Sequence, residues 1–330
     1  MEQNIKKTPL DMELIAKQTD DELFYFVDQS SVSSERITAP RYSYWRSVFR
    51  IFFSKKSNII ALSLLVIVLL MSFVFPFIFE YDKFAHNTEG IANLSPGELF
   101  DKYGFSLEWL FGTGQVGDSI FYGIWASARI SLSLSLICAL INMSIGILLG
   151  AVWGYNKAVD SVLNVIYNII ANVPYILLIS VLVYIIGSGF FSFVFALTVT
   201  GWLGIAYFMR TQVLIIRDRE YNLASKTLGT PMSRIVTKNV LPYLTSVIVT
   251  LLASEIPNYI SMEVFLTYIG VGMSAEVPSL GHMISDAQTS WTTYPWAFWA
   301  PVAISAIITV ILYVVGQNLA DASDPRSHMK

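Results

Sequence analysis

The chain has 330 residues, of which 54% are hydrophobic and 14% are charged, and its mean hydropathy is +0.57. This balance excludes an ordinary water-soluble globular protein. The net charge of −3 gives no reason to expect a nucleic-acid partner. The one cysteine, Cys138, excludes a disulfide framework and a cysteine-based metal site, and we expect it to pack inside an apolar run.

The first 57 residues predict a cytoplasmic tail that ends in an amphipathic helix. Residues 1–40 are polar and lack a sustained periodicity, which is compatible with disorder or with a short surface helix. After residue 41 an apolar and a basic helical face can be distinguished. The apolar face holds Trp45, Val48, Phe49 and Phe52, and the basic residues are Arg46 and Arg50. A helix in the inner headgroup layer and a positively charged topology anchor explain this pattern equally well.

Six apolar runs are long enough to cross a bilayer, which takes about 20 residues of helix. They comprise residues 58–79, 128–153, 162–186, 190–211, 245–270 and 296–315. The first run follows a long polar segment and lacks an Ala-x-Ala site, so we do not expect a cleaved signal peptide. The predicted fold is an all-α polytopic membrane protein with six transmembrane helices.

The basic residues predict which ends of these helices face the cytoplasm. Of the 21 Lys and Arg residues, 18 fall in the N-terminal tail, around Lys157, in the segment 210–242 or in the C-terminal tail. Positively charged loops are retained in the cytoplasm. We therefore expect a multi-pass protein of the cell membrane with both termini and the segment 210–242 inside.

These boundaries divide the chain into five parts. They are a cytoplasmic tail at 1–57, a first transmembrane helix at 58–79, an extracellular loop at 80–127, a core of five helices at 128–318 with a cytoplasmic loop at 212–242, and a cytoplasmic tail at 319–330. Within the core, Gly146, Gly150 and Gly154 form two overlapping Gly-x-x-x-Gly elements. This spacing predicts close packing of the second span against another helix.

The basic loop predicts two short helices that meet at a sharp corner. Asp218 is expected to cap the first helix, and Gly229 to end it in the left-handed conformation. Thr230 is expected to cap the second helix with Pro231 at its first position, and Pro242 to end it.

Each of these two helices carries an apolar face. The residues are Tyr221, Ala224 and Leu228 in the first, and Met232, Ile235, Val236 and Val240 in the second. A loop in water needs no apolar face unless another surface covers it. The loop therefore predicts a docking site for another protein, with an ordinary solvated loop as the alternative.

Two carboxylates fall inside the fifth apolar run. Glu255 and Glu263 project to roughly similar faces of a helix, and Pro257-Asn258 between them permits a kink. Intramembrane charges are expensive and face a cavity or a partner helix. Glu255, Asn258 and Glu263 are therefore candidates for lining a translocation path, although helix packing is the favoured explanation for Glu263.

The sequence lacks the motifs of several enzyme classes. It contains no Gly-x-x-x-x-Gly-Lys-Ser/Thr phosphate loop, no His-Glu-x-x-His and no Gly-x-Ser-x-Gly, and its three histidines are far apart. We therefore expect no catalytic site, no metal site and no cofactor on this chain. If it drives active transport, the ATPase must be a separate subunit.

The basic loop also resembles that of ATP-binding-cassette importer permeases. Their pattern is Glu-Ala-Ala, three residues, Gly, nine residues and Ile-x-Leu-Pro. The matching positions here are Leu223-Ala224-Ser225, Gly229 and Asn239-Val240-Leu241-Pro242, so that Leu223 and Asn239 replace the Glu and the Ile. The element Arg219-Glu220-Tyr221-x-x-Ala224 resembles the oligopeptide/dipeptide branch of those permeases.

Motifs elsewhere resemble the same branch, over about residues 41–326. They are Gly154-Tyr155, Asp160, Pro174 with Leu177-Leu178, the segments 263–272 and 278–281, and the segment 321–326. The outer element at 111–119 also resembles the branch, but Gly114, Asp118 and Ser119 stand at its three charged positions. The role that these charges have in relatives is therefore not carried over to this chain.

The resemblance is to the second, long-tail permease of that branch (OppC/DppC type) and implies a MetI-like type I importer fold. It implies a transport subunit that imports oligopeptides by alternating access. The implied partners are a sister permease, two ATP-binding subunits that use ATP and Mg, an extracellular peptide-binding lipoprotein and membrane lipids. The implied coupling residues are Glu220, Tyr221, Ala224, Ser225, Leu228, Gly229, Arg234, Leu241 and Pro242.

Other functions remain open at this point. In the same class, a dipeptide or nickel-ligand importer would have the same motifs. In a different class, a proton-coupled carrier or a membrane sensor would act without an ATPase. Proton coupling favours carboxylates near the membrane centre, where Glu255 is the arguable candidate.

Overall fold

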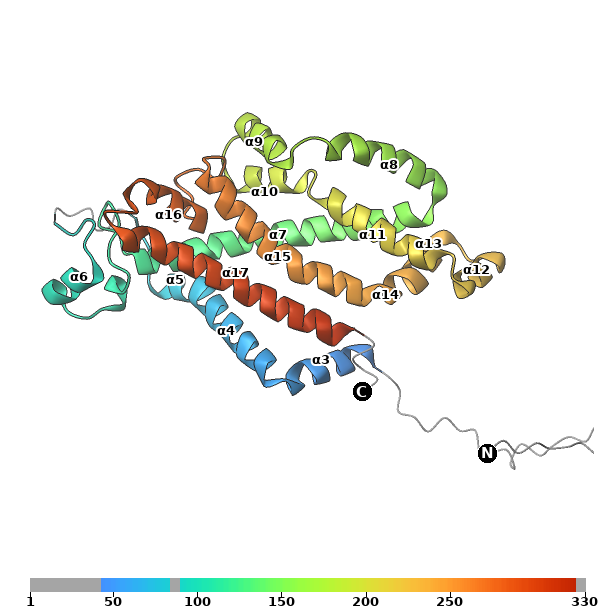
Figure 1. Cartoon of the computed structure of the whole chain (residues 1–330), viewed down its shortest axis with the longest axis horizontal. Coiled ribbons are helices and arrows are strands. Elements are labelled where there is room, and N and C mark those ends of the chain that lie inside the picture. The colour runs from blue at the N-terminus through green and yellow to red at the C-terminus, as the bar shows by residue number, and fades with distance from the viewer. Residues whose placement is uncertain (1–42, 84–89, 325–330) are drawn as a thin grey trace, which may run out of the picture. The chain divides into compact units, whose positions relative to one another are not determined.

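The computed structural model describes residues 43–83 and 90–324, which fold almost entirely into helices (Figure 1). Between these residues the one β-type pairing is an isolated bridge from Thr113 to Ser119. The predicted all-α fold is confirmed. The segment 1–40 lies outside the described residues, as do the last two residues of the 321–326 motif.

Five helical segments are long and apolar enough to cross a membrane. They are α4 with α5 (Lys56–Phe73 and Phe75–Ile78), α7 (Ile120–Tyr155), α10 with α11 (Phe190–Thr198 and Trp202–Arg217), α15 (Thr245–Tyr268) and α17 (Pro295–Ser323). A sixth candidate consists of α8 (Lys157–Ala171) and α9 (Tyr175–Ile186), which are bent by 80° relative to each other. All six predicted runs are thus helical, and the third is broken.

The break between α8 and α9 follows from Pro174. Proline has no N–H to donate, and it disfavours the helical conformation in the residue before it. Pro174 has φ −57° and a non-helical ψ of 119°, and it is the residue directly before α9. The predicted span 162–186 is therefore two helices rather than one. The two differ in packing, because α8 has no fully buried side chain whereas Ile179 and Val183 of α9 are buried.

The second span begins earlier than predicted. Ser119 caps α7 by accepting a hydrogen bond from the Tyr122 N–H at 3.3 Å, so the helix starts at Ile120 instead of residue 128. The loop predicted over 80–127 therefore ends at Ser119. It contains α6 (Pro96–Tyr103) and the short helix η3 (Leu107–Trp109). After α15 the chain forms α16 (Leu280–Asp286) and η5 (Gln288–Ser290).

The amphipathic helix expected after residue 41 is α3 (Tyr44–Ser54). Val48 and Phe52 are buried against Ala322 of α17. The Tyr44 hydroxyl donates to the Ser323 carbonyl oxygen at 2.7 Å. This contact explains why α17 continues helical through residues 319–323, which were predicted as tail. On the other flank of α3, Trp45 and Phe49 remain half exposed.

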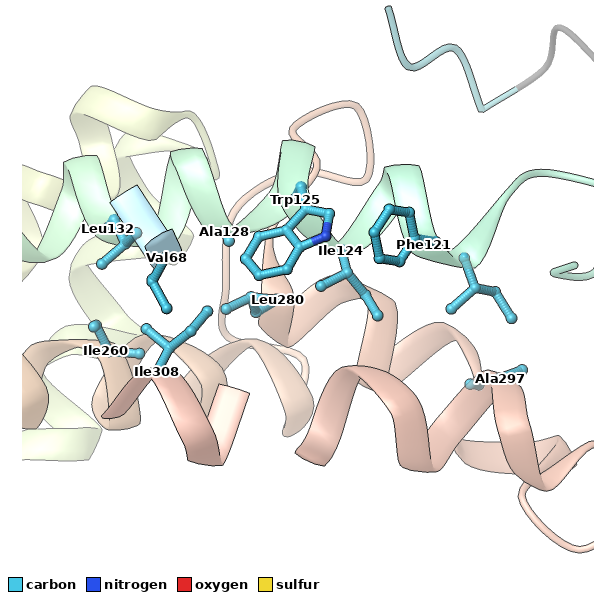
Figure 2. Packing of buried hydrophobic residues seen from close by; sticks show 12 residues of the cluster. Val68, Phe121, Ile124, Trp125, Ala128, Leu132, Ile260, Leu280, Ala297 and Ile308 are labelled. Carbon is cyan, nitrogen blue, oxygen red and sulfur yellow. The ribbon is translucent and has the colours of Figure 1, made fainter. Parts of the chain in front are cut away.

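One part of the core is organised around the first half of α7 (Figure 2). Ile124, Ala128 and Leu132 follow one another at four-residue spacing and share one face of the helix. Buried side chains of four other helices pack against this cluster. They are Val68 of α4, Ile260 of α15, Leu280 of α16 and Ile308 of α17.

The second half of α7 packs on α11 through its three glycines. A Cβ atom added at Gly146 would lie 2.7 Å from Cβ of Ile205, and one at Gly154 would lie 2.7 Å from the Arg210 carbonyl oxygen. A Cβ atom at Gly150 would likewise clash with the Ala206 backbone and the Met209 side chain. The absence of side chains therefore allows the two helix backbones to approach closely. The predicted close packing is confirmed.

Gly150→Ala is expected to lower the thermal unfolding temperature of the detergent-solubilised protein by several degrees, because overpacking costs about 1–3 kcal/mol. Gly204 on α11 is the matched control, since a Cβ atom there would meet nothing within 4 Å. Gly204→Ala should leave the unfolding temperature unchanged or raise it slightly, because alanine favours a helix over glycine. Tryptophan fluorescence during heating measures the unfolding temperature of each variant. Equal unfolding temperatures for the two variants would contradict the packing argument.

Candidate functional site

The loop between α11 and α15, residues 218–244, is the candidate site, and we call it the docking loop. α11 runs through residues 212–217, which were predicted as loop, and ends at Arg217. The Arg217 Nη1 donates to the Gly154 carbonyl oxygen at 3.1 Å, and its Nη2 pairs with Asp218 at 3.3 Å. The end of α11 is therefore bound to the end of α7 where the loop begins.

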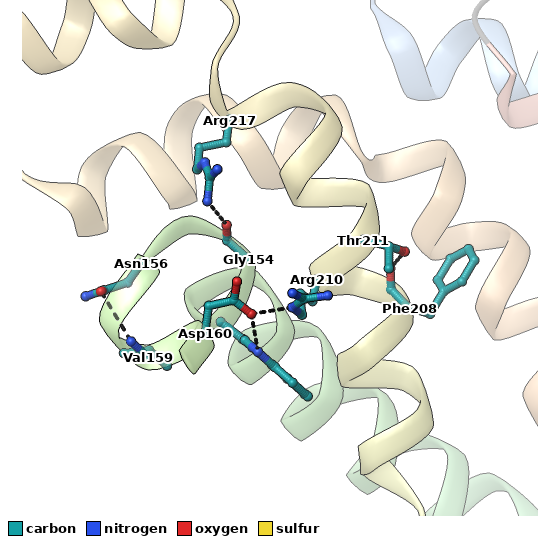
Figure 3. Close-up of polar contacts among 9 residues, drawn as sticks. Gly154, Asn156, Val159, Asp160, Phe208, Arg210, Thr211 and Arg217 are labelled. Carbon is teal, nitrogen blue, oxygen red and sulfur yellow. Dashed lines mark hydrogen bonds and ion pairs between the residues drawn. The ribbon is translucent and has the colours of Figure 1, made fainter. Parts of the chain in front are cut away.

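Asp160 joins the start of α8 to the same two helices (Figure 3). Its Oδ1 accepts hydrogen bonds from Trp153 Nε1 at 2.9 Å and from Arg210 Nε at 2.5 Å. The Arg210 guanidinium also lies over the rings of Trp153 and Tyr207, 5.7 and 5.6 Å from their centroids. One carboxylate thus connects α7, α8 and α11 close to the docking loop.

The loop begins with α12 (Glu220–Thr227), which leads into a left-handed glycine. Gly229 has φ +79°, and its N–H donates to the Lys226 carbonyl oxygen at 3.0 Å. The Thr230 N–H donates to the Ser225 carbonyl oxygen at 3.1 Å. The predicted conformation of Gly229 is confirmed. A Cβ atom there would meet nothing within 4 Å, so a substitution would cost conformational energy without causing a clash.

The predictions for three other helix ends in the loop are wrong. The residue before α12 is Arg219, with no capping side chain, because the Asp218 carboxylate pairs with Arg217. The residue before α13 (Met232–Ile235) is Pro231, one position after Thr230. Pro242 does not end a helix but lies in α14 (Leu241–Tyr243), directly after the π-helical turn η4 (Val236–Val240). The wider turn accommodates a proline that an α-helix would not.

The two apolar faces of the docking loop have different surroundings. Ile235, Val236 and Val240 are buried against this chain's own helices, including Met209 and Val213 of α11. The face on α12 is exposed, and it consists of Tyr221, Ala224 and Leu228. Glu220, Arg234 and Pro242 are also exposed, whereas Ser225 and Leu241 are partly buried. The larger apolar surface left for a partner is therefore the one on α12, where Leu228 is 86% exposed, and Tyr243 of α14 is exposed as well.

Polar contacts hold α12 in place. Asn222 is its one fully buried side chain, and Asn222 Nδ2 donates to the Ile216 carbonyl oxygen at 2.9 Å. Asn239 Nδ2 donates to Asn222 Oδ1 at 3.2 Å and approaches Ser225 Oγ at 3.4 Å. Asn239 is the residue that replaces the family's Ile. The sequence analysis did not predict this pair, because a contact between two elements across a corner leaves no periodic signal in either of them.

Glu263, one of the three path candidates on α15, lies in a packing network. It is fully buried and accepts hydrogen bonds from Ser131 Oγ at 2.7 Å and from Thr267 Oγ1 at 3.2 Å. Ser131 Oγ in turn accepts from the Leu280 N–H at 3.1 Å. The carboxylate thus joins α7, α15 and the start of α16.

The other two path candidates are in different surroundings. Glu255 is partly buried, and Asn258 is exposed. A role in lining a path stays a prediction for both residues. Among residues 43–83 and 90–324, no three His, Cys, Asp or Glu side chains are grouped as metal ligands.

Gly114, Asp118 and Ser119, which stand where the resembled element has charged residues, each have a structural role in this chain. Asp118 accepts a hydrogen bond from the Tyr81 hydroxyl at 3.0 Å. Ser119 caps α7 and donates to the Glu108 carbonyl oxygen at 2.6 Å. A Cβ atom at Gly114 would lie 3.0 Å from Cγ of Asp118, so this neighbour must be small. Gly114 and Asp118 line an open cavity of about 1000 Å³, whose other lining residues come from 80–83 and 275–290, among others.

The Asp118 carboxyl is buried, and burial raises its pKa above the usual range. The hydrogen bond from Tyr81 opposes this effect only in part. Burial and the Asp118 charge in turn raise the pKa of Tyr81. Across the cavity, Lys83 and Asp286 form an ion pair at 2.6 Å and act on Asp118 in opposite directions.

Comparison with known proteins now identifies the family. A model described as "Binding-protein-dependent transport system inner membrane component" matches residues 144–328, from the glycine contact of α7 through the docking loop into α17. The chain belongs to this family. A second model, described as "N-terminal TM domain of oligopeptide transport permease C", matches residues 43–96. This binding-protein-dependent permease is therefore a multi-pass membrane protein.

Several permeases of known systems are similar over nearly their whole length. The chain is 45% identical to the oligopeptide transport system permease protein AmiD of Streptococcus pneumoniae, covering 94% of this chain and 98% of the relative. It is 32% identical to the oligopeptide permease OppC of Bacillus subtilis, over 89% and 93% of the two chains. It is also 32% identical to the dipeptide permease DppC of that organism, over 94% of each chain.

Asn239→Leu is expected to loosen α12 by removing its contacts with Asn222 and Ser225. Each lost hydrogen bond corresponds to about 1 kcal/mol, so amide hydrogen exchange in residues 220–228 should accelerate about fivefold or more. Lys238→Leu, at an exposed position of the same turn, is the control and should leave this exchange unchanged. Unchanged exchange in the Asn239 variant would show that the pair does not hold α12.

The raised pKa of Asp118 means that this carboxyl holds its proton more tightly in the folded state than in the unfolded state. The contribution of Asp118 to local stability is therefore full below about pH 4 and is lost as the pH rises through the folded pKa. Hydrogen exchange in residues 113–119 should show more opening at pH 7 than at pH 4, after correction for the intrinsic rate. Asp118→Asn should remove this dependence, whereas Asp101→Asn, at an exposed position of α6, should preserve it. If the Asp118 variant shows the same pH dependence as the unmodified protein, Asp118 is not the group that causes it.

Proposed function

We propose that this permease is one of two membrane subunits of an ATP-powered importer of oligopeptides. The observation that carries the proposal is the exposed apolar face of α12, because the apolar side chains of η4 in the same loop are packed inside the chain. Tyr221 and Leu228 project from a short helix that this chain holds by polar contacts. Such a helix is suited to insertion into a groove of another protein. Two of the relatives are named as permeases of oligopeptide transport systems, which supports oligopeptides as the substrate class.

The partners follow from this assignment. A sister permease would complete the path, and two ATP-binding subunits would dock on the α12 surfaces and use ATP with Mg. An extracellular lipoprotein would deliver the peptide. This chain would bind no cofactor and no metal of its own. Both chain ends and the docking loop would lie in the cytoplasm, as the distribution of Lys and Arg indicates.

Movement of the ATPases would reach the membrane helices through a short series of contacts. Asn222 bonds to the end of α11 through the Ile216 carbonyl and to η4 through Asn239. η4 continues through α14 into α15, which carries Glu255 and Asn258. A push on α12 would therefore act on α11 and α15 together and would change which side of the membrane the path opens to.

The alternative functions are less well supported. The 45% identity to an oligopeptide permease exceeds the 32% identity to a dipeptide permease. A proton-coupled carrier would need an accessible intramembrane carboxylate. Of the two on α15, Glu263 is enclosed in a packing network, which leaves the partly buried Glu255 for that role. Membership of the binding-protein-dependent family favours an ATP-powered importer instead.

The test of the function is co-expression of the tagged chain with its candidate sister permease and ATPases, followed by purification and reconstitution. We expect co-purification of two ATPase copies and peptide uptake that requires ATP and the binding protein. The isolated chain should not hydrolyse ATP. ATP turnover by this polypeptide alone, or uptake without ATPases, would overturn the proposal.

Gly229→Val should abolish uptake by this complex and weaken its assembly with the ATPases. At φ +79° a β-branched residue is strained by at least about 1–2 kcal/mol, so α12 would be misdirected. Gly229→Asn is the matched control, because asparagine tolerates the left-handed region, and it should retain most of the uptake. Membrane insertion should be normal in both. Normal uptake by the valine variant would remove the support for coupling through α12.

Single-cysteine labelling in a Cys138→Ser background tests the orientation. An impermeant thiol reagent should label cysteines at positions 95 and 289 in intact cells, but not at positions 225 and 327, because the last two would face the cytoplasm. Position 289 is exposed, whereas Ser279 in the same segment is fully buried. Permeabilised cells provide the positive control for positions 225 and 327. Labelling of position 225 in intact cells would refute this topology.

A further inference from the structure

A groove between α11 and α15 combines polar side chains with an absence of charge. Its volume is about 220 Å³. The lining residues are Phe208 and Gln212 of α11, and Val247, Thr250, Leu251 and Ser254 of α15. Most of the lining surface is apolar, and its polar part comes from Gln212, Thr250 and Ser254. Both helices are candidate membrane spans, where polar side chains face a cavity or a partner more often than lipid.

The polar residues of α15 form a continuous stripe. Thr250, Ser254 and Asn258 are all exposed and follow one another at four-residue spacing, so they share one face of the helix. The hydroxyl of Thr250 donates to the Ser246 carbonyl oxygen at 3.0 Å, and that of Ser254 donates to the Leu251 carbonyl oxygen at 2.9 Å. Each hydroxyl oxygen retains lone pairs that can accept a hydrogen bond from a bound molecule.

Two carboxamides extend this chemistry. In the described part of the chain, the side chains of Gln212 and Asn258 make no hydrogen bond, although both belong to candidate membrane spans. An amide facing hydrocarbon without a partner is costly. Gln212 lines the groove, and Asn258 continues the α15 stripe one turn beyond it. Both side chains therefore need a polar neighbour from outside the chain. A carboxamide both donates and accepts hydrogen bonds, as does a peptide group.

The charged groups near the groove are directed elsewhere. Arg210 of α11 is held by Asp160. Glu263 is fully buried, and Glu255, which lies about 60° around α15 from Asn258, is partly buried and is not among the residues that line the groove. A fixed charge in the groove would bind oppositely charged side chains and repel like-charged ones. An uncharged lining treats peptides of either charge alike.

We propose that Gln212, Thr250, Ser254 and Asn258 bind the main chain of the peptide during its passage, through hydrogen bonds that do not depend on its side chains. The proposal rests on the proposed function. It adds the chemical group that is recognised and the residues that recognise it. The peptide would lie extended along the stripe of α15, because only an extended main chain offers unpaired N–H and C=O groups along its length.

The test uses the complete reconstituted importer with a photoreactive benzoylphenylalanine at position 212 or 258. A fluorescent alanine pentapeptide is supplied with its binding protein and ATP, and the membranes are irradiated during turnover. We expect an ATP-dependent peptide adduct at both positions. Position 63 of α4 is the matched control, since Ser63 is exposed and bonds back to its own helix as Thr250 does, and it should give no adduct. Adducts to the sister permease or to lipid alone would overturn the proposal.

Two further measurements separate main-chain from side-chain recognition. Pentapeptides with a central Lys or Glu should give adduct yields, normalised to uptake, within about twofold of the alanine peptide. Yields that follow the charge would refute main-chain recognition. Gln212→Met with Asn258→Leu should lower the maximal uptake rate about tenfold, with unchanged complex assembly, whereas Ser63→Leu should have no effect. Unchanged uptake by the double variant would likewise overturn the proposal.

These outcomes are distinct from a failure of the proposed function. If the unmodified complex shows ATP-dependent peptide uptake but no adduct forms at positions 212 and 258, the groove assignment alone is wrong. If no peptide is taken up by any assembled complex, the oligopeptide function is wrong, and the groove loses its ligand with it.

Discussion

The close approach of α7 and α11 at three glycines is the contact on which the candidate site depends. It places Gly154 next to α11, and the Gly154 carbonyl then accepts from Arg217 at the point where the docking loop begins. It also places Arg210 where it can bind Asp160 and so attach α8. A side chain at any of these glycines would separate the backbones and weaken both polar contacts. The direction in which α12 leaves the membrane region is therefore set by packing, several turns away from the loop itself.

Ionisable side chains join the described helices in two places. Glu263 is enclosed by hydroxyl donors and fixes α15 to α7 and α16 at one end of the bundle. Asp160 and Arg210 fix α8 and α11 at the other end. Loss of the hydroxyl donors would leave the buried Glu263 carboxylate without hydrogen bonds, which is costly. The Asp160–Arg210 pair is partly buried and contributes less. The uncharged polar stripe of α15 lies between these two regions, where the helix is free of such constraints.

Much of this architecture could be predicted from the sequence because it depends on local patterns. Apolar run length located the membrane helices, glycine spacing predicted the α7–α11 contact, and Gly229 predicted the left-handed corner. The predictions failed where a residue had two possible partners. Asp218 pairs with Arg217 instead of capping α12, and this choice depends on the position of the arginine in three dimensions. The Asn222–Asn239 pair joins two elements across a corner, and no periodicity reports such a contact.

The weakness of the contacts that hold α12 is consistent with a role in transmission. Apart from Asn222, its side chains are exposed or only partly buried, so its attachment amounts to a few hydrogen bonds of about 1 kcal/mol each. Burial of Leu228 and Tyr221 in a partner groove would contribute about 1.5–3 kcal/mol for each side chain. A docked partner would then control the position of α12 more strongly than this chain does. The hydrogen bonds to Ile216 and Asn239 would serve a different purpose, since they connect α12 to α11 and to the turn before α15. A helix bound firmly to its partner and joined by short polar links to two membrane helices can carry motion from one to the other without unfolding either.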